Sequence, residues 1–391
     1  MIKRYLKFFI FFIFMINGFT IELNGLSEKI KTINILLEKD VTEALVEVKG
    51  GYYVYNPYDG SKISSGLIGK RFIIRPIDNG IKWGGSFPDV NQITIAPKSK
   101  DISILVNGIQ YDGKMTFSKF GDKLTIVNEI NIESYLKSIL TDQFPIPLEK
   151  EVMSAVAIAA RTTSYYNILK NKDAFWHINA KDVNYNGSAL ILSNSSIVDI
   201  IDSTKDMILV NKKEDKEHLF IACWHDNSAG KTASYNSIFA NNETDIFPKN
   251  NVFSNCADLN KEDCKWEYFI SKEKLADLLE IRAEINEIEV CREKDSSKVY
   301  SFKIKTEEEI YDIDFFAFQE KIGIKNILSN DISNVFMKNN KIEFYGYGKG
   351  HGVGLCLYSA SVMAQNGDIA VNILEKFFPT SSMINFSSKL A

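Results

Sequence analysis

A glycine-rich stretch near the carboxyl end carries one of the chain's four histidines. It reads YGYGKGHGVG from Tyr345 to Gly354, so that five glycines surround Lys349 and His351. Glycine-rich loops commonly hold phosphates on exposed backbone N–H groups, but neither G-x-x-x-x-G-K-S/T nor G-x-G-x-x-G fits this stretch. Two roles remain open: the glycines let the main chain approach a ligand that His351 contacts, or they only shape a turn.

A second group of polar residues follows an apolar stretch. His225 and Ser228 come after HLFIAC, which reads as a strand, and Lys231 lies further along the same turn. Such a turn is rich in hydrogen-bond donors and suits a polar ligand. For His225, the alternative is a histidine at the edge of the core with a backbone partner.

Two helices are predicted ahead of these groups. Asn131 is suited to cap a helix that runs through Leu140, and Pro147 to start a longer helix that ends at about Leu169. Arg161 emerges from the otherwise apolar face of the longer helix, and a buried guanidinium must be paired. It either bridges the two lobes of the fold structurally or contacts the ligand.

The elements that must position these residues indicate an α+β protein. Short β segments with strong turn signals between them dominate residues 31–130. Helices and strands then mix over residues 131–380, including a hairpin that turns at Asn339-Asn340. We therefore predict a β-rich amino-terminal lobe at 31–130, a mixed lobe with several helices at 131–380, and a cleft between the two lobes.

The composition excludes several kinds of partner. Hydrophobic residues make up 45% and charged residues 25% of the chain, and the formal net charge is -4, as in ordinary globular proteins. Because there is no basic excess and no run of lysine or arginine, the sequence predicts no nucleic-acid partner. The five cysteines include no C-x-x-C pair, and His177 alone makes no metal site, so neither a metal nor a cofactor is predicted.

The amino terminus has the layout of a secretory signal. Three positive charges within the first seven residues precede an apolar run from Phe8 to Ile16. That run is too short to cross a bilayer, which takes ~20 apolar residues. We expect residues 1–22 to be a signal peptide or, because the following cleavage site is poor, an uncleaved anchor. The protein is thus expected outside the cytoplasm, whether periplasmic, associated with the cell wall or anchored to the membrane through this segment.

Three strings in a fixed order resemble the SpoIID/LytB family of bacterial cell-wall proteins. They are IESYLKSILTDQFP running into EVMSAVAIAARTTSYY, then ACWHDNSAGKTASYNSIF, and then GYGKGHGVGLCLYSASVMAQNG. The family pattern has E-x-Y-L leading into an A-A-R-T helix, a strand ending in Y-H-S-S-S-G-G-x-T, and a G-H-G-V-G loop that opens a helix. The resemblance covers residues 31–380 and implies work on peptidoglycan. SpoIID-like members act as lytic transglycosylases with a glutamate as general acid and base, whereas LytB-like members were described as enhancers of cell-wall amidases.

The chain departs from this family at the catalytic position. Counting forward from Tyr135 and back from Arg161 places Gln143 where the family glutamate belongs, and Asp142 where the family usually has serine. An amide has no titratable proton and cannot act as the acid. Asp142 could replace it only if the backbone turned, because neighbours on a helix point ~100° apart; the alternative for Asp142 is a solvated or capping carboxylate. Enzymatic activity is therefore left open.

The resemblance also implies a set of ligand-binding residues. Tyr185 and Gly187 keep part of the family's Q-x-Y-x-G string, but its glutamine is missing, as are the Cys/His zinc ligands that some members carry there. In a glycan-binding cleft, His351 would donate a hydrogen bond to the sugar or position residue 143. The predicted substrate-binding residues are Arg161, Tyr185, His225, Ser228, Lys231, Gly350, His351 and Gly352.

Taken together, these residues predict an exported peptidoglycan-binding protein that has an altered catalytic site. Its expected partners are glycan strands and a cell-wall amidase or another cell-wall hydrolase. The alternative is an active lytic transglycosylase that uses Asp142 as a displaced acid.

Overall fold

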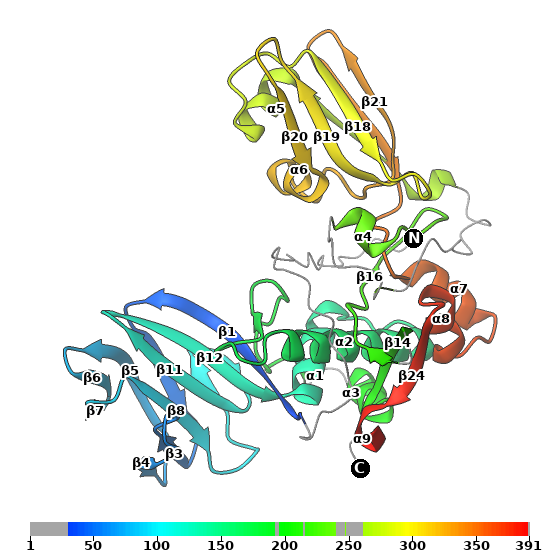
Figure 1. Ribbon diagram of the computed structural model, residues 1–391. Helices are drawn as coiled ribbons and strands as arrows, with labels where there is room; N and C mark the ends of the chain where they lie inside the picture. The colour runs from blue at the N-terminus through cyan, green and yellow to red at the C-terminus, as the bar shows by residue number, and fades with distance from the viewer. Residues whose placement is uncertain (1–29, 192–194, 214–215, 240–246, 248–260, 390–391) are drawn as a thin grey trace.

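The computed structural model describes residues 30–191, 195–213, 216–239, 247 and 261–389. Several sheets and several helices occur together in it (Figure 1), so the α+β prediction is confirmed. The predicted signal peptide or anchor, residues 1–22, lies outside the described residues. Within the described part of the chain, no helix is both long enough and apolar enough to cross a membrane.

The amino-terminal part consists of two sheets that contribute side chains to one large hydrophobic cluster. The seven-stranded sheet has the order β13-β1-β12-β11-β8-β3-β4, and the six-stranded sheet has the order β10-β9-β2-β5-β6-β7. Side chains alternate between the two faces of each strand, so one face of each sheet supplies the apolar residues. The strands are β1 (Thr32–Val41), β2 (Ala44–Val48), β3 (Tyr52–Tyr55), β4 (Lys62–Gly66), β5 (Lys70–Ile77), β6 (Gly80–Trp83), β7 (Gly85–Pro88), β8 (Gln92–Pro97), β9 (Ile104–Val106), β10 (Ile109–Tyr111), β11 (Lys114–Phe120), β12 (Lys123–Asn131) and β13 (Ile178–Asn179).

Helix α1 (Ile132–Gln143) begins directly after β12. As predicted, Asn131 caps it: the Asn131 side chain accepts hydrogen bonds from the backbone N–H groups of Glu133 and Ser134, at 3.0 and 3.4 Å. These two hydrogen bonds satisfy backbone N–H donors that the first helical turn leaves unpaired. The hydrophobic cluster continues from the sheets into the helices and so runs through the lobe boundary placed near residue 130.

The second helix, α2 (Lys150–Lys170), is buried on all sides from residue 152 to residue 166. It begins at Lys150, so the predicted start at Pro147 is wrong. The chain first passes through Glu149, whose carboxylate accepts hydrogen bonds from Ser361 (2.9 Å) and Gln365 (3.1 Å) of helix α7 (Leu357–Gln365). These tertiary contacts place the helix start after the proline.

The predicted strand HLFIACWH is present only at its two ends. His218 ends β15 (Lys216–His218), and β16 (Trp224–His225) pairs with β23 (Leu355–Cys356). Between them, the main chain of Ala222 bonds to the Thr163 hydroxyl of α2 instead of to a strand, at 3.0 Å for its N–H and 3.3 Å for its carbonyl. The remaining elements around α2 are α3 (Ser195–Ser203), β14 (Met207–Lys213), α4 (Tyr235–Ile238), α8 (Ala370–Phe377), β24 (Ser381–Asn385) and α9 (Phe386–Lys389).

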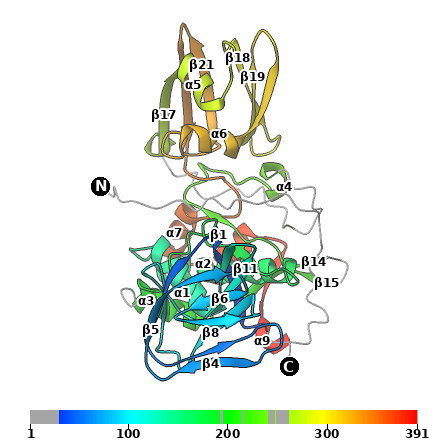
Figure 2. The same ribbon diagram turned by 90° about the vertical axis from the view of Figure 1, so that its left-hand side faces the viewer.

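Residues 265–347 form an inserted unit with a hydrophobic core of its own. Figures 1 and 2 show it standing apart from the sheets and helices of the main unit. Its core includes Phe302, Phe318 and Phe344, and its two ends meet because Gly348 donates its N–H to the Cys264 carbonyl at 2.8 Å. Its elements are β17 (Lys265–Ser271), α5 (Lys272–Leu279), β18 (Glu287–Arg292), β19 (Val299–Lys305), β20 (Ile310–Asp314), α6 (Phe315–Ile322), β21 (Ile332–Lys338) and β22 (Lys341–Tyr347), preceded by the 3-10 turn Lys261–Cys264.

Candidate functional site

The last turn of α1 carries the residue at the family's glutamate position. Gln143 is the final residue of this helix and is only 6% exposed. Its Oε1 atom is buried and has no hydrogen-bond partner among the residues that the structure describes. A buried polar atom without a partner costs about 1–3 kcal/mol, so the fold keeps here a polar group that its own contacts do not satisfy.

Asp142 lies beside Gln143 but faces different surroundings. It is partly exposed, and its Oδ2 atom accepts a hydrogen bond from the Asn186 side-chain amide at 2.9 Å. The bond ties the end of α1 to the loop that follows β13. The two neighbouring side chains therefore do not share one environment, as expected for positions ~100° apart on a helix.

Tyr185 fills space inside the protein. It is 3% exposed, and its hydroxyl donates to Asn128 Oδ1 at 2.8 Å. Its ring lies against Tyr111 and Tyr135, with centroids 5.7 and 5.9 Å away, and burial raises the pKa of Tyr185 well above its usual value. In this structure Tyr185 joins the sheet to α1 and offers no open face to a sugar.

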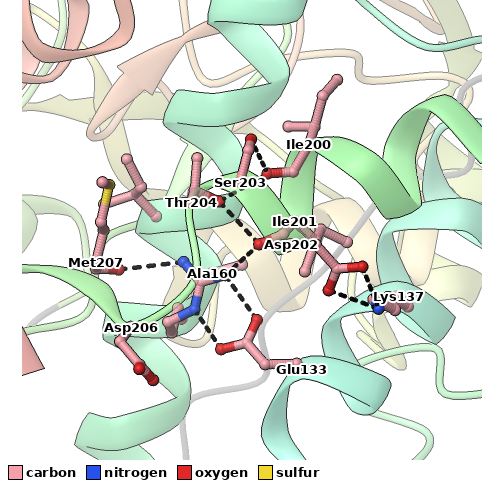
Figure 3. Close-up of polar contacts among 12 residues, drawn as sticks. Glu133, Lys137, Ala160, Ile200, Ile201, Asp202, Ser203, Thr204, Asp206 and Met207 are labelled. Carbon is pink, nitrogen blue, oxygen red and sulfur yellow. Dashed lines mark hydrogen bonds and ion pairs between the residues drawn. The ribbon is translucent and has the colours of Figure 1, made fainter. Parts of the chain in front are cut away.

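Arg161 forms a buried ion pair with Glu133; Figure 3 labels Glu133 together with Ile201 and Met207, whose carbonyls also bond to the guanidinium. Its side chain is 0% exposed, and it donates to both carboxylate oxygens of Glu133, at 2.8 and 2.7 Å. Further N–H groups donate to the carbonyls of Met207 (3.1 Å) and Ile201 (3.3 Å). The expectation that the guanidinium is paired is confirmed. Its acceptors lie on α1, α3 and β14, all within residues 131–380. The role of Arg161 is therefore structural, but its described contacts tie together parts of the predicted mixed lobe instead of bridging the two lobes.

His225 lies in the parallel pair of β16 and β23. It is 4% exposed, and its Nδ1 atom is 3.0 Å from the carbonyl oxygen of Val353. Because a carbonyl only accepts, Nδ1 carries the proton. The alternative prediction for His225, a core-edge histidine with a backbone partner, is thereby confirmed.

His351 of the glycine loop faces His225, with ring centroids 5.5 Å apart. Its Nδ1 accepts a hydrogen bond from the Val353 N–H at 3.1 Å. The His351 and Phe239 rings meet edge to face, with centroids 5.4 Å apart. Burial and the nearby His225 lower the pKa of His351 to about 3, and a hydrogen bond with the Trp224 backbone acts in the opposite direction. His351 is therefore neutral near pH 7.

The glycines around His351 allow the loop to pass close to other parts of the protein. Gly350 and Gly352 have positive φ angles of 100° and 70°, which residues with a Cβ rarely adopt. A Cβ on Gly350 would lie 2.8 Å from the His225 Cβ, and one on Gly352 would lie 2.9 Å from Lys298 Cε. These contacts support the loop-shaping role, whereas contact of the glycines with a glycan stays a prediction.

Ser228 and Lys231 both contact the inserted unit. The Ser228 carbonyl accepts a hydrogen bond from Lys298 Nζ at 2.6 Å, and the same Nζ pairs with Asp331 at 2.6 Å. Lys231 Nζ donates to the Asp295 carbonyl at 2.5 Å. The turn that the sequence assigned to ligand binding therefore also serves as the junction between the main unit and residues 265–347.

Among the predicted site residues, His225, Ser228, Gly350 and His351 gather around β16 and β23. Gln143 is the last residue of α1, and within the described ranges no hydrogen bond joins its Oε1 atom to this group. The described residues contain no group of three or more His, Cys, Asp or Glu side chains arranged to hold a metal.

Four residues that shape these groups were not identified from the sequence. Lys298 and Asn330 belong to the inserted unit. Lys298 donates a hydrogen bond to the Ser228 carbonyl of the turn, and Asn330 donates one to the His351 carbonyl of the glycine loop at 2.9 Å. No local pattern marks them, because each acts on a distant loop. Asn186 and Glu133 lie within the strings VNYNG and IESYL, but the sequence did not show that they bond to Asp142 and Arg161.

Comparison with known families defines the class of the α1–α2 region. The family described as stage II sporulation protein, SpoIID, matches residues 121–211, which include α1, α2 and the buried Arg161–Glu133 pair. The chain therefore carries a SpoIID family domain over these residues, and the family prediction from the sequence is confirmed. A SpoIID domain indicates a cell-wall-related protein.

Among individual proteins, the chain is similar to uncharacterized proteins of three bacteria. A Chlamydia muridarum protein is 36% identical over 181 residues, or 46% of this chain and 63% of that protein. A Chlamydia pneumoniae protein is 32% identical over 179 residues, or 45% of this chain and 65% of that protein. A Brachyspira hyodysenteriae protein is 26% identical over 359 residues, which cover 88% of this chain and 90% of that protein. The matched part spans less than two thirds of each chlamydial protein.

Proposed function

We propose that this chain is an exported cell-wall protein that binds peptidoglycan glycan strands, or regulates a cell-wall amidase, without cleaving the glycan itself. The proposal combines the SpoIID domain at residues 121–211 with the amide at position 143. That amide is the observation that carries it, since the family's chemistry takes place at this position.

Cleavage of a glycosidic bond by this family's route needs a carboxyl group. It must protonate the leaving oxygen and then take a proton back, and transfer of this kind contributes roughly a hundred- to ten-thousandfold in rate. The environment of Gln143 would suit such an acid, because a carboxyl group buried without a partner has a raised pKa. Gln143 Oε1 has this burial and this lack of a partner among the described residues. The buried surroundings of position 143 would therefore suit a carboxylic acid, whereas the amide has no titratable proton.

The other two carboxylates of α1, Glu133 and Asp142, do not replace it directly. Glu133 is held by both of its oxygens on Arg161, and freeing it would leave a guanidinium buried without its partner. Asp142 is more accessible but bonds to Asn186 on another side of the helix. Asp142 is nevertheless the remaining acid next to Gln143, so an active lytic transglycosylase with Asp142 as the displaced acid is the alternative.

The deciding experiment incubates the purified chain with denuded and with intact glycan strands and searches for anhydro-ended products by mass spectrometry. Sedimentation with purified cell wall measures binding in parallel. We expect the wild-type protein and Asp142→Asn to bind the wall and release no product, and Gln143→Glu to release anhydro-ended sugars.

Two outcomes separate the alternatives. Wild-type cleavage that disappears in Asp142→Asn, with wall binding retained, would identify Asp142 as the acid and refute the proposal of a silent protein. Absence of wall binding by the folded wild-type chain, together with no effect on an added amidase, would remove the proposed function altogether.

A further inference from the structure

The outer face of the seven-stranded sheet carries a hollow of ≈ 230 Å³, and none of the predicted site residues lines it. Along β11 the side chains alternate, so that Met115 and Phe117 point into the core while Thr116 and Ser118 point to the opposite face. This opposite face forms the floor of the hollow. The floor is polar, although it belongs to the strand that supplies core residues.

Aromatic rings form the wall of the hollow. Phe120 ends β11, and Phe175 and Trp176 belong to the segment between α2 and β13. Phe120 is 53% exposed and Phe175 is 62% exposed, and their rings meet edge to face with centroids 6.2 Å apart. Large apolar side chains exposed next to each other commonly mark a binding surface.

The wall is held in place by the edge of the sheet. His177 donates its N–H to the Asn34 carbonyl at 2.9 Å, and the Asn34 N–H donates to His177 Nδ1 at 3.0 Å. Asn171 adds a hydrogen bond from its side-chain amide to the His177 carbonyl at 2.8 Å. The rings just before His177 are therefore positioned before any ligand arrives, which reduces the entropy lost on binding.

The floor offers hydroxyl and amide groups with little charge. Thr116 shares a hydrogen bond of 2.8 Å with Thr94, which does not itself line the hollow, and Gln92 donates to the Ser118 hydroxyl at 2.9 Å. Each hydroxyl has one donor and two acceptor positions, so these bonds leave capacity for a ligand.

Among the described residues, Glu129 is the only charged one that lines the hollow, and it pairs with Lys114 at 3.0 Å. No described lysine or arginine lines it, although Lys39 Nζ lies 6.0 Å from the centroid of the Trp176 ring. With its one lining charge already paired, the hollow favours a neutral polar ligand.

We infer that this hollow is a carbohydrate subsite that takes a neutral pyranose ring. A pyranose has an apolar C–H face, which stacks on an aromatic ring, and a rim of hydroxyls that bond to groups such as those of Thr116 and Gln92. In identifying the sugar as N-acetylglucosamine of a glycan strand, the inference rests on the proposed function. The subsite lies on the β sheet, apart from Gln143 and the glycine loop, and would hold the strand at a second point.

The chain carries its own reporter for this test. Of its four tryptophans, Trp176 is partly exposed and lines the hollow, whereas Trp83, Trp224 and Trp266 are buried. Titration of the full chain with the neutral tetramer of N-acetylglucosamine should give a saturable change in tryptophan fluorescence. The change should be absent in Trp176→Phe.

Removing one ring of the wall should weaken the titration. We expect Phe175→Ala to raise the dissociation constant by about tenfold, the scale of losing one good aromatic contact. The matched control is Phe269→Ala, which removes a 40% exposed ring from the inserted unit and should leave the titration unchanged. Both residues are exposed, so both variants should keep the wild-type melting temperature.

The outcomes distinguish this inference from the proposed function. A wild-type chain that sediments with cell wall but shows no saturable fluorescence change at millimolar tetramer would overturn the subsite alone, as would equal weakening by Phe269→Ala. A titration that depends on Phe175, in a chain that neither sediments with cell wall nor affects an amidase, would leave the sugar subsite standing and refute the proposed function.

Discussion

At the scale of single residues, the SpoIID segment depends on one buried ion pair. Arg161 comes from the middle of a helix that is buried on every side from residue 152 to residue 166, and Glu133 comes from the first turn of α1. The pair lets a charged residue lie in the core, since the two opposite charges pair and two carbonyls accept further N–H groups. Removing one partner leaves the other charge buried and alone.

We therefore predict that Arg161→Met lowers the free energy of unfolding by about 3–5 kcal/mol, measured by urea denaturation. The double variant Arg161→Met with Glu133→Leu should recover part of this loss, because no uncompensated charge remains. Lys137→Met is the matched control, since it breaks the more exposed pair with Asp202 and should cost less than about 1 kcal/mol. Equal losses in the two single variants would contradict this account of Arg161.

His351 predicts a pH dependence of stability. Its pKa in the folded protein is about 3, whereas an unfolded histidine has a pKa of about 6.5. Below pH 6.5 the unfolded state binds the proton more strongly, so stability falls with falling pH, by up to about 1.4 kcal/mol per pH unit until the folded pKa is reached. Unfolding free energies measured between pH 7 and pH 4 should therefore fall more steeply for wild type than for His351→Gln. Parallel curves for the two proteins would show that His351 does not titrate in this way.

At the scale of elements, the glycine loop connects β22 to the short parallel pair of β16 and β23. Gly354 has a φ of 73°, and a Cβ there would lie 2.2 Å from the Cys223 carbonyl oxygen. The loop thus reaches β23 only by passing directly over the chain that leads into β16. This close passage explains glycine at position 354 by conformation and space alone.

Gly354→Ala should therefore be more destabilising than an alanine at another glycine with positive φ. Strain in the left-handed region costs about 1–2 kcal/mol, and overpacking against the Cys223 carbonyl adds about 1–3 kcal/mol. Gly367, with a φ of 94° and open space around it, provides the control, since Gly367→Ala incurs the strain alone. Thermal melts of the two variants test this, and a loss for Gly354→Ala no larger than for Gly367→Ala would argue against the close passage.

At the scale of the whole molecule, the inserted unit meets the main unit at the predicted ligand-binding turn. Lys298, 1% exposed, reaches from the inserted unit to the Ser228 carbonyl, and Asn330 reaches the His351 carbonyl. Most apolar side chains of residues 265–347 pack into the unit's own core. Phe316 is an exception, since it packs against both hydrophobic clusters and stacks on Phe239 with ring centroids 5.2 Å apart. The insertion therefore holds the glycine loop and meets the main unit through this ring as well.

Because its core is separate and its ends meet, the segment from residue 261 to residue 348 should fold when expressed alone. We expect a cooperative thermal transition by circular dichroism and by tryptophan fluorescence of the buried Trp266. Phe302→Ala should lower the midpoint of this transition, because Phe302 is fully buried in the unit's core. A non-cooperative melt of the isolated segment would show that the main unit is needed for its folding.

Features that depend only on neighbouring residues could be predicted from the order of amino acids. The Asn131 cap, the turn at Asn339-Asn340 and the alternation of the amino-terminal strands follow from the residues within each element. The family pattern also aligned Gln143 with the family glutamate and Asp142 with the family serine. This alignment needs only the order of residues, because no gap interrupts the count from Tyr135 or from Arg161.

The contacts of those residues depend on segments that lie far apart in the chain. His225 and Val353 are 128 residues apart in the chain, and Lys298 and Ser228 are 70 apart, so no local pattern relates them. Contacts between distant segments also explain three differences from the prediction. They are the later start of α2, the interruption of the HLFIACWH strand and the separate core of residues 265–347. Burial and long-range hydrogen bonds arise when distant segments meet. For this reason the sequence predicted Arg161 and Tyr185 as ligand contacts, whereas in the structure both are buried and bond to other parts of the protein.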